Sequence, residues 1–383
     1  MLIFAIYHNY ILSIINNNFF TITQFLYQSV SLIFIIALLI KSKFQSYLFY
    51  NNGIITAFLT ISFGFSIYQR DIDYNLLFFV ILTYIVLFNK NFYSLNIKNF
   101  LFKNIIIIFL IALIEIIFNE AYYNFTNIHS YYLNTREWYQ GNTKNIDYYA
   151  GISRTSGNYF LNIINYRISS IFIEPLSLSY FCIISFIFYN YQDDTNKTVN
   201  YKKIIFNLII FFLIIVSDTR SALFFLFILF LPNRIFKIKN LPIILFLSLF
   251  IYLYFLVYGL NNDEFIFRIS HSKISDVSLL QLINLKAYYY NEFYDSGYVN
   301  IFMNFGIFGF FLILYLLFKL PNHLKNINSD KLVLLNKCLI YFIFFNLFGS
   351  AVYSIKTTLL LFYFINLYFI ELIDKKKISI ERK

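Results

Sequence analysis

Long apolar runs separated by polar links recur from one end of the chain to the other. Each run approaches the roughly 20 residues that a helix needs to cross a bilayer. The chain lacks ten-residue segments of alternating polar and apolar positions, which a membrane β-barrel requires. The pattern predicts an all-α polytopic integral membrane protein with about 12 transmembrane helices in a single transmembrane domain, residues 1–383. The expected spans are 1–17, 20–40, 53–68, 74–88, 100–118, 167–190, 203–216, 219–232, 241–258, 297–319, 332–349 and 354–372.

Two long polar connections, 119–166 and 259–296, interrupt these spans, and the other links are short. The N-terminal segment MLIFAIYHNYILSII lacks a basic start and a small-residue cleavage site, so we interpret it as a mature span. Composition supports the membrane prediction, because a chain with 60% hydrophobic and 13% charged residues has too little polar surface to cover a soluble fold of this length.

The distribution of basic residues predicts the orientation, because Lys and Arg collect on the cytoplasmic side. With both termini cytoplasmic, the inner links and tail hold 20 of the 30 basic residues, and the two long loops are external. A single helix over 203–232, with Arg220 at its middle, would export the basic C-terminal tail. We therefore favour a hairpin whose turn, 217–220, faces outward. The net charge of +11 follows from this topology and gives no reason to expect nucleic acid.

Lysine and arginine differ in their predicted side. Of 22 Lys, 18 are internal, whereas six of the eight Arg are external. Chance in a small set, with lysine enriched in solvated tails, is one explanation. The other is an outward-facing anion site, because a planar guanidinium grips phosphate oxygens bidentately. The external basic residues are Arg70, Arg136, Arg154, Arg167, Arg220 and Arg268, with Lys144, Lys273, Lys286 and Lys356.

The stretch from Arg154 to Pro175 carries charged residues directly into an expected membrane span. If 167–174 were helical, Arg167 and Glu174 would share one face about 10 Å apart, with room for a ligand between them. Pro175 predicts a kink or break at Glu174. Residues 175–190 span only about 24 Å, which places Glu174 in the outer third of the bilayer. An acid at that depth is a functional candidate. The alternative is an interfacial glutamate that snorkels or caps a helix.

The turn Ser217–Arg220 lies between two short apolar segments of about 21 Å each. It must dip below the surface or line a water-filled cavity, because irregular backbone is not tolerated against lipid. We expect it near the depth of Glu174. The alternative is an ordinary hairpin turn with an ion pair between Asp218 and Arg220.

The two external loops supply further candidates. Arg136 and Trp138 are candidate glycan-binding residues, since aromatic faces stack on sugar rings, although aromatic residues are no denser there than in the whole chain. His271 could act as a general base, because imidazole titrates near neutral pH, or it could simply be solvated. Asp295 is a third catalytic candidate, or it caps the helix that begins at Ser296.

No zinc-protease HExxH motif, Cys/His cluster or nucleotide-binding loop is present in the sequence. The sequence therefore predicts no metal and no cofactor. Cys182 and Cys338 both lie in apolar segments and cannot frame a disulfide scaffold.

Three segments, taken together, resemble the Wzy-type O-antigen and capsule repeat-unit polymerases, which are related to the O-antigen ligases. They are R-x-S-S-x-F-x-E-P-x-x-L (Arg167 to Leu178), S-D-T-R-S-A-L (Ser217 to Leu223), and D-S-G-Y followed by N-F-G-I-F-G (Asp295 to Gly309). The resemblance covers residues 150 to 320. It implies inverting, metal-independent glycosyl transfer on the outer face of the bacterial inner membrane. The implied donor is a glycan on polyprenyl pyrophosphate, and the acceptor is a lipid-linked oligosaccharide repeat unit. A chain-length regulator and a flippase are expected partners besides the lipid bilayer.

Carried onto this chain, the resemblance implies that Arg167 and Arg220 hold the pyrophosphate, and the external Arg154 and Arg268 are further candidates. His271 matches by location a histidine in the second large loop of ligase relatives, and Glu174 is the competing base. Two other functions are open. A lipid-linked oligosaccharide flippase or other transporter commonly shows two related halves, which this sequence lacks. An O-antigen ligase shares the chemistry but hands the glycan to a different acceptor.

Overall fold

The computed structural model describes residues 2–30, 33, 97–135, 166–191, 201–236, 329–348, 356–357, 360–361 and 364. Throughout these residues the chain is helical, turn or irregular, with no β-strand, which confirms the all-α prediction for this part. The chain forms two compact units. The first unit comprises Met1–Phe34, Ser94–Phe230 and Ser354–Leu360, and the second comprises Ile35–Tyr93, Leu231–Tyr353 and Leu361–Lys383.

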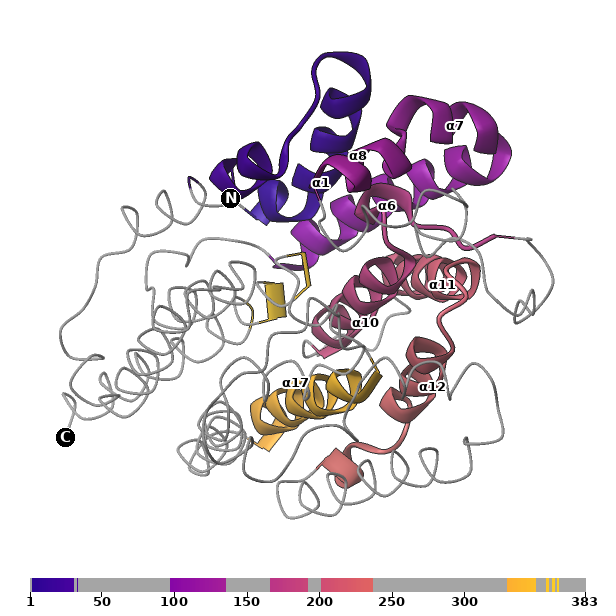
Figure 1. Cartoon of the computed structure of the whole chain (residues 1–383). Helices are drawn as coiled ribbons and strands as arrows, with labels where there is room; N and C mark the ends of the chain where they lie inside the picture. Colours follow the sequence, from indigo (N-terminus) through magenta and orange to yellow (C-terminus); the bar gives the residue numbers. More distant parts are fainter. Residues whose placement is uncertain are drawn as a thin grey trace, which may run out of the picture. The chain divides into compact units, whose positions relative to one another are not determined.

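Most helices of the described residues belong to the first unit (Figure 1). They are α1 (Leu2–Asn18), α6 (Ile97–Ile117), α7 (Asn119–Thr126), α8 (Ile128–Thr135), the 3-10 turn η3 (Ser170–Phe172), α10 (Pro175–Tyr191), α11 (Tyr201–Val216) and α12 (Arg220–Leu229). In the second unit the 3-10 turn η4 (Asn233–Phe236) packs on α17 (Ser329–Phe348).

Helices therefore form at the expected spans 1–17, 100–118, 203–216 and 332–349, over most of 219–232, and over 167–190 from Pro175 onward. The expected spans 53–68, 74–88, 241–258 and 297–319 lie outside the described residues, as do most of 20–40 and 354–372. The count of twelve spans, the single transmembrane domain and the cytoplasmic placement of both termini stay predictions.

Helix α10 is the centre of the first unit. It packs against α6, α11, α12 and η3, and residues 177–189 are buried on every side. This explains why its sequence is apolar all round, since a surface helix would show one polar face. Asn190 and Asn207 exchange two amide hydrogen bonds of 2.8 and 3.0 Å between α10 and α11. These paired amides fix the register of the two helices.

Outward faces of the first unit carry large apolar side chains. On α6 the exposed residues recur at helical spacing, while Asn104 and Glu115 point inward and are buried. In a soluble protein we would expect the opposite pattern, with the apolar side chains buried and the polar ones exposed, because soluble monomers rarely expose contiguous apolar patches. The exposed residues are Ile107, Leu110, Ile114 and Ile117 on α6, Ile204, Ile205, Leu208 and Phe211 on α11, and Phe224 and Phe227 on α12.

Helix α6 is also long and apolar enough to cross a membrane, and it is the one helix of this kind among the described residues. Its length and its outward apolar stripe agree with membrane association. The inner-membrane location and the multi-pass topology stay predictions.

Helices α7 and α8 form the start of the expected first external loop, and both pack on α1. The contact is polar as well as apolar: the Tyr131 hydroxyl donates to Asn9 Oδ1 at 3.1 Å, and Asn16 Nδ2 donates to Ser130 Oγ at 3.3 Å. Buried polar groups on an apolar helix need hydrogen-bond partners. The segment after α6 is therefore folded onto α1, where it supplies hydrogen-bond partners to Asn9 and Asn16.

A charge placed on the outward stripe of α6 tests whether lipid covers it. Ile107 is 43% exposed and lies at the middle of the helix. We expect Ile107→Lys to disfavour insertion by about 2.5–3.5 kcal/mol, the usual cost of a lysine at the centre of a membrane helix. A glycosylation-reporter assay of membrane insertion measures this, with Ile107→Leu as the control. Equal insertion of both variants would show that water, and not lipid, covers this face.

Candidate functional site

The candidate site is built on residues 166–174, the irregular segment that leads into α10. Only Ser170–Phe172 form a helical turn, and α10 begins at Pro175. The break expected at Glu174 is therefore confirmed, because proline fits the first position of a helix and disfavours helix before it. The conditional helix over 167–174 does not form. The spacing of about 10 Å between Arg167 and Glu174, which rested on that helix, is withdrawn.

The backbone of this segment is strained at two positions. Ser170 and Ile173 have φ angles of 49° and 54°, in the left-handed region. This conformation is uncommon for a β-branched residue such as Ile173 and costs on the order of 1–3 kcal/mol. Ile173 is fully buried in a cluster with Ile128, Tyr131 and Tyr132 of α8. Packing against α8 therefore holds the strained backbone that places Glu174.

Glu115, in the last turn of α6, anchors the same segment. Its side chain is fully buried, and it accepts hydrogen bonds from the backbone N–H groups of Ser169 (3.1 Å) and Ser170 (2.6 Å). The Ser169 hydroxyl (3.3 Å) and the Tyr123 hydroxyl (2.8 Å) also donate to it. Ser169 has right-handed and Ser170 left-handed backbone angles, an arrangement that turns successive N–H groups toward one anion. The Glu115 carboxyl group occupies the concave site that these N–H groups form.

Two further hydrogen bonds hold Ser170 to α7 and α6. The Tyr122 hydroxyl donates to the Ser170 carbonyl at 2.8 Å, and the Ser170 hydroxyl donates to the Ile108 carbonyl at 2.8 Å. Burial raises the pKa of the Tyr122 phenol well above its ordinary value, and the nearby Glu115 adds to this. Tyr122 therefore remains a neutral donor at physiological pH. Ser169 and Ser170 act as structural anchors of the motif.

Arg167 joins this segment to the turn between α11 and α12. The Ile168 N–H donates to the Val216 carbonyl at 3.0 Å, Arg167 Nε donates to the Ser217 carbonyl at 3.0 Å, and Arg167 Nη2 donates to Thr219 Oγ1 at 3.3 Å. The structure thus brings together the two motifs that the sequence separates by 50 residues.

The turn itself interrupts what could have been one long helix. Helix α11 ends at Val216, Asp218 has a φ angle of 47°, and α12 begins at Arg220. A left-handed residue cannot continue a right-handed helix. The break expected at this turn is therefore confirmed, and the single helix over 203–232 does not form. Ser217, Asp218 and Thr219 are all buried.

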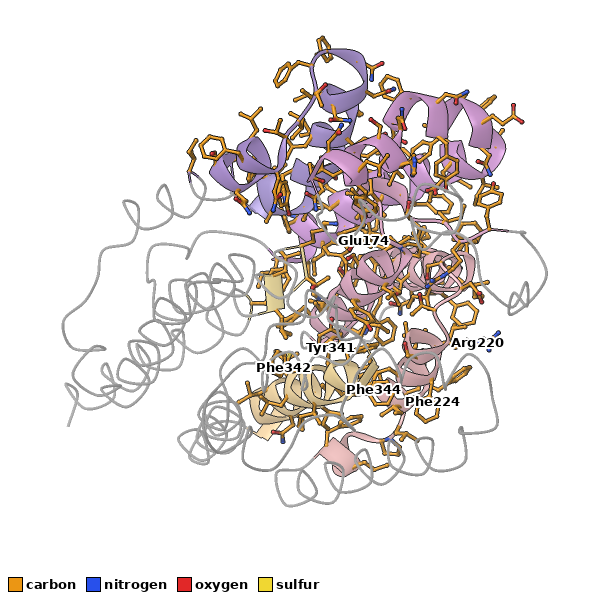
Figure 2. All side chains as sticks on the ribbon, viewed as in Figure 1. Glu174, Arg220, Phe224, Tyr341, Phe342 and Phe344 are labelled. Carbon is orange, nitrogen blue, oxygen red and sulfur yellow. The ribbon has the colours of Figure 1, made fainter. Side chains whose placement is uncertain are left out.

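Arg220 is the first residue of α12 and is exposed. Its side chain extends away from the ribbon of α12, at a distance from the central position of Glu174 (Figure 2). Arg167, in the irregular segment before η3, contacts Thr219, the residue that precedes Arg220 at the start of α12. The two arginines are candidates for the two halves of an anion clamp.

Glu174 sits at the start of α10 and is only partly exposed. Its carbonyl accepts the Leu178 N–H at 3.1 Å, as a helix-capping residue does, which agrees with the capping alternative for this residue. Its carboxylate has other partners: Tyr132 donates to Oε1 at 3.1 Å and Ser177 donates to Oε2 at 2.8 Å. Lys356 Nζ lies 3.7 Å from Oε2.

The other predicted site residues lie outside the described residues. These are Arg136, Trp138, Arg154, Arg268, His271 and Asp295. Among the residues that are described, no three His, Cys, Asp or Glu side chains gather as a metal site would need.

The apolar pattern does not single out Glu115, Tyr132 or Lys356, although all three hold the site. One signal was present for Glu115, since an acid inside an apolar span is a functional candidate by default. Tyr132 and Lys356 carry no such signal, because tyrosine is abundant in this chain and Lys356 is one of several external lysines.

No protein family, no curated protein and no solved structure matches this chain. The similarity to the Wzy-type polymerases therefore rests on the motifs themselves. The structure adds that two of these motifs, around Arg167 and Ser217, are hydrogen-bonded to each other.

Replacing Glu115 by glutamine tests its role as the anchor of residues 166–174. We expect Glu115→Gln to destabilise this segment by on the order of 2 kcal/mol, because an amide N–H2 donor replaces one of the two oxygens that accept the buried N–H groups of Ser169 and Ser170. Amide exchange at Ser169 and Ser170 would then become roughly thirtyfold faster, measurable by mass spectrometry or NMR. The control is Glu120→Gln, an exposed glutamate on α7. Unchanged exchange in Glu115→Gln would contradict this role.

Proposed function

We propose that this protein is a Wzy-type polysaccharide polymerase of the bacterial inner membrane. It transfers a growing glycan from polyprenyl pyrophosphate to a lipid-linked oligosaccharide repeat unit on the outer face, without a metal. The observation that carries the proposal is the hydrogen-bonded contact between the Arg167 segment and the Ser217–Arg220 turn. This contact joins two of the resembling motifs, and Arg220 follows directly after Thr219, which Arg167 contacts.

A departing pyrophosphate needs positively charged donors that are already oriented when its charge develops. The Arg167 guanidinium is oriented by the Ser217 carbonyl and Thr219, and Arg220 adds a second guanidinium at the same turn. Arg220 also lies at the N-terminus of α12, where the helix dipole favours an anion. Arg154 and Arg268 would add further positive charge around the pyrophosphate.

The proposed reaction is an inverting displacement. A hydroxyl of the acceptor sugar attacks the anomeric carbon of the donor glycan, the new C–O bond forms, and the bond to the pyrophosphate oxygen breaks. The electron pair leaves with the pyrophosphate, whose charge the arginines stabilise. The hydroxyl proton passes to a carboxylate, for which Glu174 is our candidate, with His271 as the competing base and Asp295 as a further catalytic candidate. Arg136 and Trp138 would bind the glycan.

An O-antigen ligase would use the same machinery with a different final acceptor. A flippase or other transporter would use the arginines to line a path and would form no glycosidic bond. The polymerase is favoured over transport because the sequence lacks the two related halves that transporters commonly show.

Replacing each arginine by lysine tests the clamp. We expect Arg220→Lys to lower the rate of polymer formation about 10²–10³-fold, since a point charge replaces a planar fork while the exposed position tolerates the change. Arg167→Lys should have at least this effect, because an ammonium group cannot reproduce the planar fork that binds Ser217 through Nε and Thr219 through Nη2. Polysaccharide chain length on gels measures the outcome in cells, with membrane-inserted protein quantified in parallel.

The matched control is Arg234→Lys, at an arginine that the sequence places on the inner side. It should leave the polymer unchanged. Normal long-chain polysaccharide in both Arg167→Lys and Arg220→Lys would contradict the proposed function.

A further inference from the structure

We propose that Lys356 is a positioning residue of this site, which acts through Glu174 to prepare it for the acceptor hydroxyl. The inference rests on the proposed function and deepens it, because it assigns the Tyr132, Glu174 and Lys356 cluster to the acceptor side of the reaction. It comes from contacts that join three distant parts of the chain within the first unit.

Lys356 is almost completely buried. Its Nζ donates to the Phe172 carbonyl at 2.7 Å and lies 3.7 Å from Glu174 Oε2, and it is separated from Phe172 by 184 residues in the sequence. The Lys356 side chain is 2% exposed, whereas that of Glu174 is 27% exposed. The ammonium therefore lies behind the carboxylate, and the carboxylate faces the accessible side.

A buried ammonium is costly, since removing a charge from water costs several kcal/mol even after relaxation. Well-packed apolar residues at such a pair are often as stable as the ion pair itself. Stability alone is therefore a weak reason for a lysine here. A buried positive charge directly behind a partly exposed carboxylate does have a chemical use.

That use follows from the behaviour of carboxyl groups away from bulk water. Without a counter-charge, such a group tends to hold its proton and cannot accept another. Lys356 supplies the counter-charge, while Tyr132 and Ser177 each bind one carboxylate oxygen and fix its orientation. In the transfer step the acceptor hydroxyl proton moves to Glu174, and Lys356 keeps all of its own protons.

The alternative is a purely structural role, in which Lys356 ties residues 356–357 to the η3 turn. The two roles predict different behaviour when both charges are removed together. Loss of one partner leaves a lone buried charge, whereas loss of both leaves a neutral pair. A role through Glu174 requires that Lys356→Met lose no further activity once Glu174 is glutamine, whereas loss of the tie to the Phe172 carbonyl would lower activity in both backgrounds.

The experiment is a double-mutant cycle with Lys356→Met, Glu174→Gln and the two combined, in full-length protein purified in detergent. Thermal stability and the kcat and KM for lipid-linked repeat units are measured for each. We expect each single variant to lose stability and the double variant to recover part of it, because the hydrogen bond to the Phe172 carbonyl stays lost. We expect kcat to fall about 10²-fold or more in all three, the usual contribution of a general base, with KM for the donor unchanged.

The key result is that Lys356→Met causes no further loss of kcat once Glu174 is glutamine, since it acts only through that carboxylate. Lys103→Met, at an exposed lysine of α6, is the control and should match the unaltered protein. A double variant that recovers both stability and kcat would overturn the inference, as would Lys356→Met with unaltered kcat. In those cases the polymerase itself would still stand, provided that Arg220→Lys remains impaired. If the unaltered protein forms no glycosidic bond, both proposals fail.

Discussion

The buried carboxyl group of Glu115 is the contact on which the rest of the candidate site depends. It lies in an apolar helix and has no access to water, so its oxygens need hydrogen-bond donors from the protein. The donors come from the backbone of Ser169 and Ser170, and their convergence on one carboxyl group requires the left-handed conformation at Ser170. The position of α6 therefore determines the path of the chain from Tyr166 to Glu174.

Once this path is fixed, its two ends meet different partners. At the Arg167 end the segment is hydrogen-bonded to the turn between α11 and α12. At the Glu174 end it is held by Tyr132 of α8 and by Lys356. One short segment thus links a cationic region suited to a pyrophosphate with a carboxylate suited to an acceptor hydroxyl. In the proposed reaction these are the leaving-group side and the nucleophile side.

Local sequence signals predicted most of the helices and the two helix breaks at the site. Apolar runs predicted α1, α6, α11, α12 and α17. Pro175 predicted the start of α10, and the basic tail together with the SDTR turn predicted the break after Val216. The contacts of Glu115 and Lys356 were not predictable in this way, because their partners lie about 50 and 180 residues away and are selected by tertiary packing. Helices α7 and α8 were missed for a related reason: their polar composition resembles a loop until the polar face of α1 supplies its partners.

The central claim is that this chain makes glycosidic bonds between lipid-linked repeat units. The most direct measurement incubates the purified full-length protein with polyprenyl-pyrophosphate-linked repeat units and resolves the products by chain length. The proposed function predicts a ladder of products that differ by one repeat unit, formed without added metal or nucleotide sugar. Transfer of a single glycan to a different lipid would identify a ligase instead, and the absence of any new glycosidic bond would contradict the account.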